Sequence, residues 1–343
     1  ITQQLAYEIW NAPRSIQMGR GIAGTTRLCT WEGSQVIVKE SDLENAFARQ
    51  YDEAFRMAKN RYNMKKDVLL KWAMEEAEKT TIRGQAMTEA AMHLALYRRM
   101  DARCRRFVSI PACMSFEPRF FDPDTGKERL FTVQSLAQPS FIGGQSMMGG
   151  DWGRYIKKHA ENFQRRNAPG RWERFLSEVG ALYGEMTGCF HRCGIVHGDL
   201  HANNIVVHWR DSPTFDLDEV RFEMTAIDWG RARDHWKFLL READDGALRP
   251  CYHFANTRPE RKPTQAERQV AGVALHGVPS CVGDFFLFMQ MLQSIVVDTP
   301  IRRDHENQDF ARATEEDWRR VRVVMQAYRD AYNRELAKGR AAK

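Results

Sequence analysis

The feature that most constrains this chain is a polar loop held between short apolar runs. Residues 195–207 read Ile-Val-His-Gly-Asp-Leu-His-Ala-Asn-Asn-Ile-Val-Val, and residues 226–230 read Ala-Ile-Asp-Trp-Gly. Short β-branched runs are typical of strands, so the pattern predicts two strands around the loop and a third that ends just before an aspartate. The polar residues that follow these strands are Asp199, Asn204 and Asp228.

These three side chains suit phosphoryl transfer. The reaction needs a carboxylate beside the attacking hydroxyl and hard oxygen ligands for the Mg²⁺ that bridges the phosphates. We expect Asp199 to act as the catalytic base, with Asn204 and Asp228 as the metal ligands. ATP and Mg²⁺ are the cofactors of such a reaction.

The spacing His197-x-Asp199-x-x-x-x-Asn204, followed by Asp228-Trp-Gly230, resembles the catalytic loop and metal-binding motif of the protein-kinase-like superfamily. The resemblance covers roughly residues 17–297. It implies an α+β, bilobal protein-kinase-like fold. The small N-lobe would be strand-rich with a helical insertion, and the larger C-lobe would be mostly helical.

Two more motifs precede the loop in the order that the family has them. The string Gly19-Arg-Gly21-Ile-Ala-Gly24 is similar to the family's glycine-rich loop, and Val36-Ile-Val-Lys39 is similar to its lysine strand. The resemblance implies that the three glycines cover the nucleotide phosphates and that Lys39 neutralises them. Loops with three glycines are common, so the shared order of four motifs is the stronger signal.

In the family a helix glutamate holds the strand lysine. Glu89 is the candidate here, because the helix that it opens is followed by a loop and a strand. Residues 41–85 would then be a helical insertion. The rivals on the preceding helix are Glu75, Glu76 and Glu78, and the sequence leaves the choice open.

A passage rich in glycine and serine, residues 138–150, separates a strand-rich half of the chain from a helical half. We therefore place the N-lobe at residues 1–138, a linker at 139–150 and the C-lobe at 151–343.

Apolar periodicity and turn signals predict the elements of each lobe. The N-lobe is expected to hold a hairpin of residues 26–31 and 35–39, helices at about 41–79 and 88–105 interrupted at Gly84, and strands at 107–114 and 130–134. The C-lobe is expected to hold an amphipathic helix at 172–192, a buried helix at 285–297 and a solvated basic helix at 319–343.

Two features of the sequence indicate different classes of acceptor substrate. His201 stands where Ser/Thr protein kinases usually carry lysine, and the string His-Gly-Asp-Leu-His is similar to aminoglycoside and choline kinases. Against this, 56 positions separate Asp228 from Asp284. A stretch of this length resembles the activation segment and peptide platform of protein kinases. In that resemblance Asp284 bonds back to the catalytic loop.

We favour Ser/Thr hydroxyls of a protein substrate, in an atypical kinase resembling the eukaryotic-like kinases that bacteria and pathogens deploy as effectors. A small-molecule kinase, a pseudokinase scaffold and an AMP transferase stay open as alternatives. Gly198 stands where regulated kinases carry an arginine that contacts a phosphorylated loop, so we expect no phospho-switch through that contact. The alternative is that Arg231 or Arg233 supplies it.

Composition narrows the partners and the compartment. The net charge of +6 is too small to indicate nucleic-acid binding, and no run of 18 apolar residues predicts a membrane span. Seven scattered cysteines favour reduced thiols, and therefore the cytoplasm, or a host cytoplasm for a secreted effector. A zinc site within residues 189–201 is the weaker alternative, because no Cys-x-x-Cys pair exists. The first residue is Ile1, so we also expect a segment or a processing site upstream.

Overall fold

A computed structural model describes residues 1–21, 24–41, 65–79, 82–138, 144–153, 170–210, 222–234, 240–242, 248–250 and 314–339, with isolated positions that include Asp284 and Phe288. The chain divides into two compact units. Unit 1 comprises Ile1–Ala95 and Ile110–Leu136, and unit 2 comprises Leu96–Ser109 and Ala137–Lys343.

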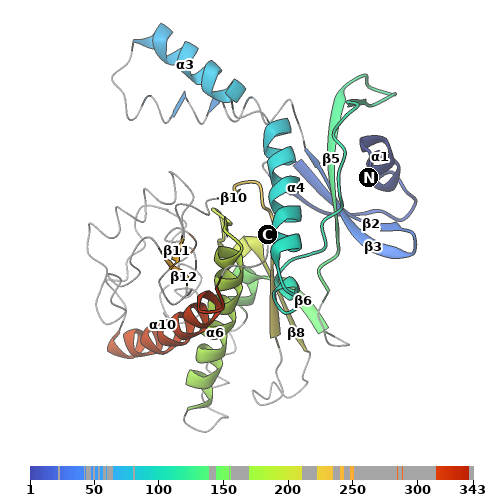
Figure 1. The fold of residues 1–343 in the computed structure, drawn as a ribbon. Helices are drawn as coiled ribbons and strands as arrows, with labels where there is room; N and C mark the ends of the chain where they lie inside the picture. Colours follow the sequence, from blue (N-terminus) through green and yellow to red (C-terminus); the bar gives the residue numbers. More distant parts are fainter. Residues whose placement is uncertain are drawn as a thin grey trace. The chain divides into compact units, whose positions relative to one another are not determined.

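Unit 1 is built on a five-stranded antiparallel sheet (Figure 1). Its strands are β1 (Ile16–Gly21), β2 (Gly24–Trp31), β3 (Ser34–Ser41), β4 (Phe120–Phe121) and β5 (Glu128–Ser135). The order is β1–β2–β3–β5–β4, so β3 is the central strand. Glu32 and Gly33 turn the chain between β2 and β3 with φ values of 48° and 76°, which match the twist of a hairpin. The predicted hairpin and the predicted strand at 130–134 are confirmed.

Helix α1 (Gln3–Trp10) packs on this sheet (Figure 1). Its Ile9 and Trp10 join Val38 and Phe131 in one buried apolar cluster. Gln3 is also buried, but its side chain accepts from the N–H of Phe131 at 2.7 Å and donates to the carbonyl of Phe131 at 3.1 Å. These bonds offset the cost of burying an amide, and they tie α1 to β5.

The helices after β3 differ from the prediction within the described ranges, and most of residues 42–64 of the expected helix lie outside those ranges. Helix α3 is Lys66–Lys79, and helix α4 is Ile82–Arg99. Gly84 lies inside α4, so the prediction that it interrupts the helical region was wrong. One glycine costs a helix only about 1 kcal/mol relative to alanine, which the Ala- and Met-rich helix around it tolerates. The predicted strand at 107–114 forms only single bridges, at Val108 and Pro111.

Unit 2 holds the end of α4 and the later elements. They are the 3₁₀ helices η1 (Cys104–Phe107) and η2 (Ala202–Asn204), the helices α6 (Arg171–Arg192) and α10 (Glu315–Leu336), and the strands β6 (Gly144–Met148), β7 (Ile195–Val196), β8 (Ile205–Arg210), β9 (Phe222–Ala226), β10 (Arg233–Asp234), β11 (Leu240–Glu242) and β12 (Leu248–Pro250). β6, β8 and β9 form an antiparallel sheet in that order, β7 pairs with β10, and β11 pairs with β12. β6 lies within residues 139–150, the segment expected to be a linker.

Helices α6 and α10 pack backbone to backbone. A Cβ added to Gly180 would lie 2.2 Å from the carbonyl oxygen of Val324, and one added to Gly184 would lie 2.2 Å from that of Tyr328. The contact points advance in the same direction along both helices, so the helices run parallel. Only glycine permits so close an approach.

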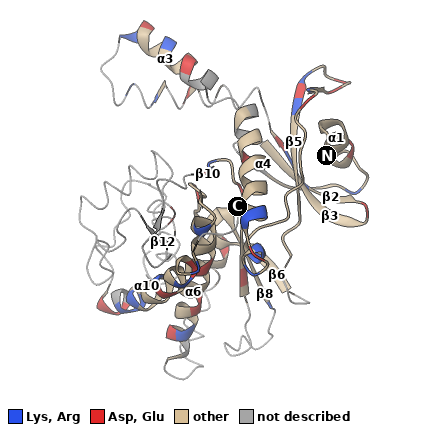
Figure 2. Ribbon diagram, viewed as in Figure 1, with Lys and Arg blue, Asp and Glu red and all other residues tan. Residues whose placement is uncertain are grey.

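Helix α10 corrects the prediction of a solvated basic helix. Its apolar face is buried, through Val321, Val324, Met325, Tyr328, Tyr332 and Leu336. Figure 2 shows that basic and acidic residues both occur along α10. One of them, Arg319, donates to Glu173 of α6 at 2.6 Å. Exposed charges therefore occupy one side of a helix whose other side, which includes the buried Glu335, belongs to the core of unit 2.

The expected buried helix at 285–297 lies outside the described residues, apart from Phe288. That ring is fully buried between Tyr183 and Tyr328, with centroid distances of 4.1 Å and 4.9 Å. Within the described ranges, no helix is both long and apolar enough to cross a bilayer.

Candidate active site

The loop that dominates the sequence lies in unit 2 between β7 and β8. The N–H of His201 donates to the carbonyl of Asp199 at 2.8 Å, and the N–H of Asn204 donates to the carbonyl of His201 at 2.8 Å. The side-chain Nδ2 of Asn204 donates to the carbonyl of Asp199 at 2.7 Å. Asp199 and Asn204, two of the predicted site residues, are thus hydrogen-bonded to each other.

The third residue follows the end of β9. The N–H of Ile227 donates to the carbonyl of Asn204 at 2.9 Å, which fixes the next residue, Asp228, beside the loop. The structure therefore brings Asp199, Asn204 and Asp228 together within one unit.

Asp284 anchors the start of the loop. Its Oδ2 accepts from the N–H of His197 at 3.0 Å and its Oδ1 accepts from the N–H of Gly198 at 2.9 Å. Oδ2 also lies 3.1 Å from Nε2 of His191 on α6. The expectation that Asp284 bonds back to the loop is confirmed.

His197 is fully buried and bonded at both ring nitrogens. Nε2 lies 3.0 Å from the carbonyl of Ile227, and Nδ1 lies 3.3 Å from the N–H of Asp199, so these partners assign the proton to Nε2. Burial lowers the pKa of His197, and the attraction of Asp284 only partly offsets that effect. A neutral imidazole thereby joins the strand end before Asp228 to the loop that holds Asp199.

Two backbone conformations in this region are unusual. Gly198 has φ of 77°, in the left-handed region where a side chain is strained. A glycine at this position avoids that strain. Asp228 has φ of 64° although it carries a side chain. Aspartate is among the residues that tolerate this region, and such conformations cluster at functional sites.

The neighbouring side chains of Asp199 lie close to one of its two carboxylate oxygens. Its Oδ2 lies 3.5 Å from Nδ2 of Asn204, 3.8 Å from Nε of Arg231 and 3.9 Å from Nε2 of His201. Within the part of the chain that the structure describes, no group donates to Oδ1. The side chain is 29% exposed, so Oδ1 can accept a proton from a hydroxyl that approaches from solvent.

The donor set on the other two residues fits Mg²⁺. Because Nδ2 of Asn204 is bonded to Asp199, the amide oxygen Oδ1 is the atom left to act as a ligand. Asp228 adds an exposed carboxylate. Amide and carboxylate oxygens are the hard donors that Mg²⁺ prefers, so Asn204 and Asp228 would hold it.

The three glycines of the glycine-rich string lie on the paired strands β1 and β2 of unit 1. Gly21 pairs with Gly24, and Gly19 pairs with Thr26. A Cβ on Gly24 would lie 1.8 Å from the carbonyl oxygen of Glu40, whereas a Cβ on Gly19 would meet nothing within 4 Å. Gly24 is therefore required by the sheet itself, while Gly19 leaves open space along β1.

Lys39 and Glu89 also come together in unit 1. Nζ of Lys39 lies 3.0 Å from Oε2 and 3.3 Å from Oε1 of Glu89. Lys39 stands on the central strand β3, and Glu89 extends from α4. Of the rival glutamates, Glu75 is exposed, and the side chains of residues 76 and 78 lie outside the described parts.

The cysteines correct two expectations. Cys104 and Cys189 form a disulfide, so they are not the reduced thiols that the sequence indicated. The zinc alternative also fails, because Cys189 is in that disulfide, His191 contacts Asp284 and His197 contacts a carbonyl. In the described ranges, the group with metal-like geometry is Cys104, Cys189 and Glu335, and a disulfide is not a thiolate ligand.

Sequence reasoning missed the polar residues of α6 that support the loop. The hydroxyl of Tyr183 donates to the carbonyl of Leu200 at 2.9 Å, and His191 Nδ1 lies 2.8 Å from the hydroxyl of Tyr332. The signal was present. Tyr183, Thr187 and His191 stand at steps of four residues, which places a polar line along a helix that is otherwise apolar on this side.

Comparisons with known proteins find matches among solved structures alone. No family model matches the sequence, and no curated protein matches it. Among solved structures, 153 chains match. One is a crystal structure of a kinase domain, at 14% identity and a TM-score of 0.35. The match covers 84% of this chain and 65% of that domain, which is less than two thirds of its length. No subtype or substrate follows from this match.

Proposed function

We propose that this chain is an ATP- and Mg²⁺-dependent phosphotransferase that phosphorylates Ser or Thr hydroxyls of a protein. The observation that carries the proposal is the joined site in unit 2. There the side chain of Asn204 is bonded to Asp199, and Ile227 holds Asp228 beside them. A base and two hard oxygen donors in one hydrogen-bonded group are what phosphoryl transfer requires.

Each residue has a defined role in the proposal. Asp199 orients the acceptor hydroxyl and accepts its proton at Oδ1, while His201 and Arg231 hold the position of Oδ2. Asn204 and Asp228 bind Mg²⁺, which when bound neutralises the charge that develops on the phosphates. In unit 1, Glu89 holds the stem of Lys39 so that its ammonium is presented to phosphate oxygens.

The choice of a protein acceptor rests on the chain between Asp228 and Asp284. Its 56 positions give room for a surface that binds a peptide. The exposed Arg231 is also suited to contact an acceptor, because its side chain is 60% exposed although it lies beside Asp199.

The test is incubation of the purified chain with ATP and Mg²⁺, together with a generic protein acceptor and, separately, an aminoglycoside and choline. Intact mass of each product gives the outcome. A gain of about 80 mass units on protein supports the proposal, and a gain of about 329 means that AMP is transferred instead. The matched controls are Asp199→Asn and Asp228→Asn, which should gain at most a small fraction of what the wild type gains in the same time.

Two other outcomes would contradict the proposal. Phosphate found on the small molecules and not on protein would identify a small-molecule kinase. Nucleotide binding without any transfer to an acceptor would identify a pseudokinase.

A further inference from the structure

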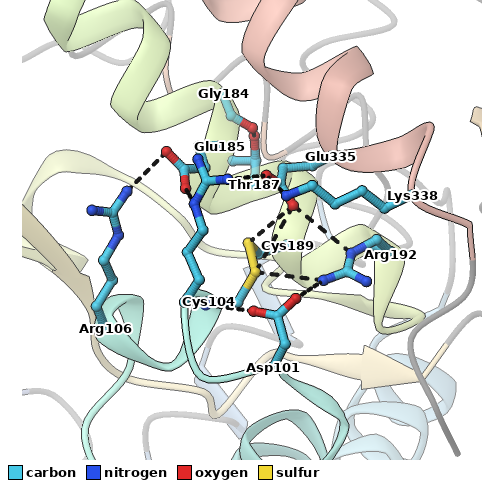
Figure 3. The surroundings of a disulfide bond; sticks show 11 residues. Asp101, Cys104, Arg106, Gly184, Glu185, Thr187, Cys189, Arg192, Glu335 and Lys338 are labelled. Atoms are coloured by element: carbon cyan, nitrogen blue, oxygen red, sulfur yellow. Dashed lines mark hydrogen bonds and ion pairs between the residues drawn. A yellow bond between two sulfur atoms is a disulfide. The ribbon is translucent and has the colours of Figure 1, made fainter.

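A buried cluster of sulfur and charge lies in unit 2 at the last turn of α6 (Figure 3). The disulfide joins Cys104 of η1 to Cys189 of α6, and both residues are fully buried. Oε2 of Glu335, on α10, lies 3.7 Å from Sγ of Cys189 and 4.0 Å from Sγ of Cys104. Nη2 of Arg192 lies 3.7 Å from Sγ of Cys104.

The carboxylate of Glu335 is only 2% exposed and is balanced by cations. Arg192 Nε and Arg103 Nη1 each lie 3.9 Å from its oxygens, and Lys338 pairs with it as well. Burying charged groups costs free energy even when they are paired. A disulfide that served only to brace the fold would be accommodated by apolar neighbours, so the charged groups around these sulfurs suggest chemistry at the sulfurs.

We propose that Cys104 and Cys189 form a reversible dithiol–disulfide site that exchanges with small-molecule disulfides such as oxidised glutathione. Glu335 is the proton acceptor for the thiols, and Arg192 stabilises the thiolate of Cys104. This assignment is separate from phosphoryl transfer, and it involves none of the groups assigned to that reaction.

The exchange balances in two displacements. Cys104 loses its proton to Glu335, and its thiolate attacks one sulfur of the small disulfide, so that an S–S bond forms to Cys104 and one small thiolate leaves. The thiolate of Cys189 then attacks Sγ of Cys104 and releases the second small thiolate. Two electrons pass to the small disulfide, and with the two protons from the protein thiols it becomes two thiols.

The surroundings keep the neighbouring thiol of Cys193 out of the reaction. Cys193 lies four residues beyond Cys189, just past the end of α6, but burial raises the pKa of its thiol to about 12. The thiolate is the nucleophile, so Cys193 stays an unreactive thiol at neutral pH. Arg192, Arg103 and Lys338 around Glu335 also oppose a metal cation, although the three ligand atoms are close enough to hold one.

The experiment titrates the purified chain in buffers with different ratios of reduced to oxidised glutathione. Samples are quenched with acid, denatured, alkylated and weighed intact, and the protease fragments are mapped. We expect the number of alkylated thiols to fall from seven to five in one cooperative step, with the cross-linked fragment containing Cys104 and Cys189. Cys193→Ser is the matched control and should lose two thiols at the same ratio. Cys104→Ser and Cys189→Ser should lose none.

The role of Glu335 is tested by rate. Glu335→Gln keeps the size of the side chain but removes the proton acceptor, so thiol loss at pH 7 should slow by about tenfold or more while the Cys104–Cys189 fragment still forms.

Three results would overturn the proposal. The wild type could keep all seven thiols in every buffer, or it could join a different pair of cysteines. The reduced chain could also carry one equivalent of metal by elemental analysis, which would make the cluster a metal site. The wild-type measurement needs no variant and no enzymatic activity, so it is decisive even where a serine variant does not fold, and it is independent of the proposed phosphotransferase reaction.

Discussion

At the scale of single residues, His197 is fully buried and both of its ring nitrogens are bonded. Because burial lowers its pKa, the folded chain should keep this ring neutral below pH 6.5, where an unfolded histidine takes up a proton. We expect the ring resonances of His197 in an NMR titration to stay unchanged from pH 7.5 to pH values below the ordinary midpoint of about 6.5. A midpoint at or above that value would contradict the assignment.

The lowered pKa of His197 also makes the free energy of unfolding depend on pH. Between the ordinary pKa and the lowered pKa, the unfolded chain binds more protons than the folded chain. The contribution of His197 to stability is therefore complete above about pH 6.5 and declines as the pH falls through that window. Burial also lowers the pKa of His208, which adds a slope of the same sign.

Asp199 is the residue on which the proposed reaction depends. In Asp199→Asn the backbone carbonyl that receives Asn204 Nδ2 is unchanged, so the loop should keep its structure. We expect turnover to fall by about 10²–10⁴-fold with nucleotide affinity nearly intact, the usual effect of losing a positioned proton acceptor. Initial rates and nucleotide titrations measure the two effects separately.

Asp228→Asn is the matched comparison. Asparagine also tolerates the positive φ at this position, so the change removes charge without backbone strain. Affinity for Mg²⁺-nucleotide should fall in this variant and not in Asp199→Asn. Equal loss of nucleotide binding in both would indicate that Asp199 has a structural role only.

At the scale of elements, the contact between β3 and α4 through Lys39 and Glu89 can be tested with a double-mutant cycle. Each side chain needs the other to present the ammonium, so Lys39→Ala, Glu89→Ala and the double variant should lose nearly the same transition-state free energy. Additive losses in kcat/KM would show that the two act independently. Glu75→Ala, on the exposed surface of α3, is the control and should change nothing.

The packing of α6 on α10 gives a second element-scale prediction. Alanine normally favours a helix over glycine by up to about 1 kcal/mol. At Gly184 the added methyl would lie 2.2 Å from the carbonyl oxygen of Tyr328, so α10 must shift. We expect Gly184→Ala to lower the free energy of unfolding by roughly 1–3 kcal/mol, as overpacking does. Gln326→Ala, on the exposed side of α10, should stay within about 0.5 kcal/mol in the same urea titration.

Elements with a strong local signal were predictable, and those decided by distant partners were not. Gly33 stands between two β-rich runs and marks a tight turn, so the β2–β3 hairpin follows from the sequence. The burial of α10 depends on three glycines of α6 more than a hundred positions earlier. The apolar residues of α10 stand at steps of three and four, which is the pattern of a helix with one buried face. The excess of basic residues in that tail favoured a solvated helix instead.

The functional residues can be divided in the same way, into those with a local sequence signal and those decided by distant partners. Asp199, Asn204 and Asp228 are fixed by short-range spacing and were predictable. The pairing of Cys104 with Cys189 bridges 85 positions and leaves no spacing signal, so only the folded chain reveals it. Composition pointed to free thiols because it carries no information about which cysteines meet.

For the molecule as a whole, the disulfide between Cys104 and Cys189 closes a covalent loop of the chain. The loop starts and ends in unit 2, yet it contains Ile110–Leu136 of unit 1. Closing a loop of 85 positions removes chain entropy from the unfolded state, by roughly 4–5 kcal/mol in the simplest treatment. We expect reduction to lower the midpoint of chemical unfolding in the wild type and in Cys193→Ser. The midpoint of Cys104→Ser should not respond to reductant, and an equal response would contradict the role of the disulfide.

The position of α10 near the end of this sequence has a consequence for the order in which a ribosome makes the parts of unit 2. Cys104 and Cys189 are both synthesised before Glu335, the residue that later covers them. At 5–20 residues per second, the chain from the end of α6 to the end of α10 takes roughly 7–29 s to translate. During that interval neither sulfur is shielded by α10. The Cys104–Cys189 pair can therefore exchange with a cellular disulfide before α10 packs against it.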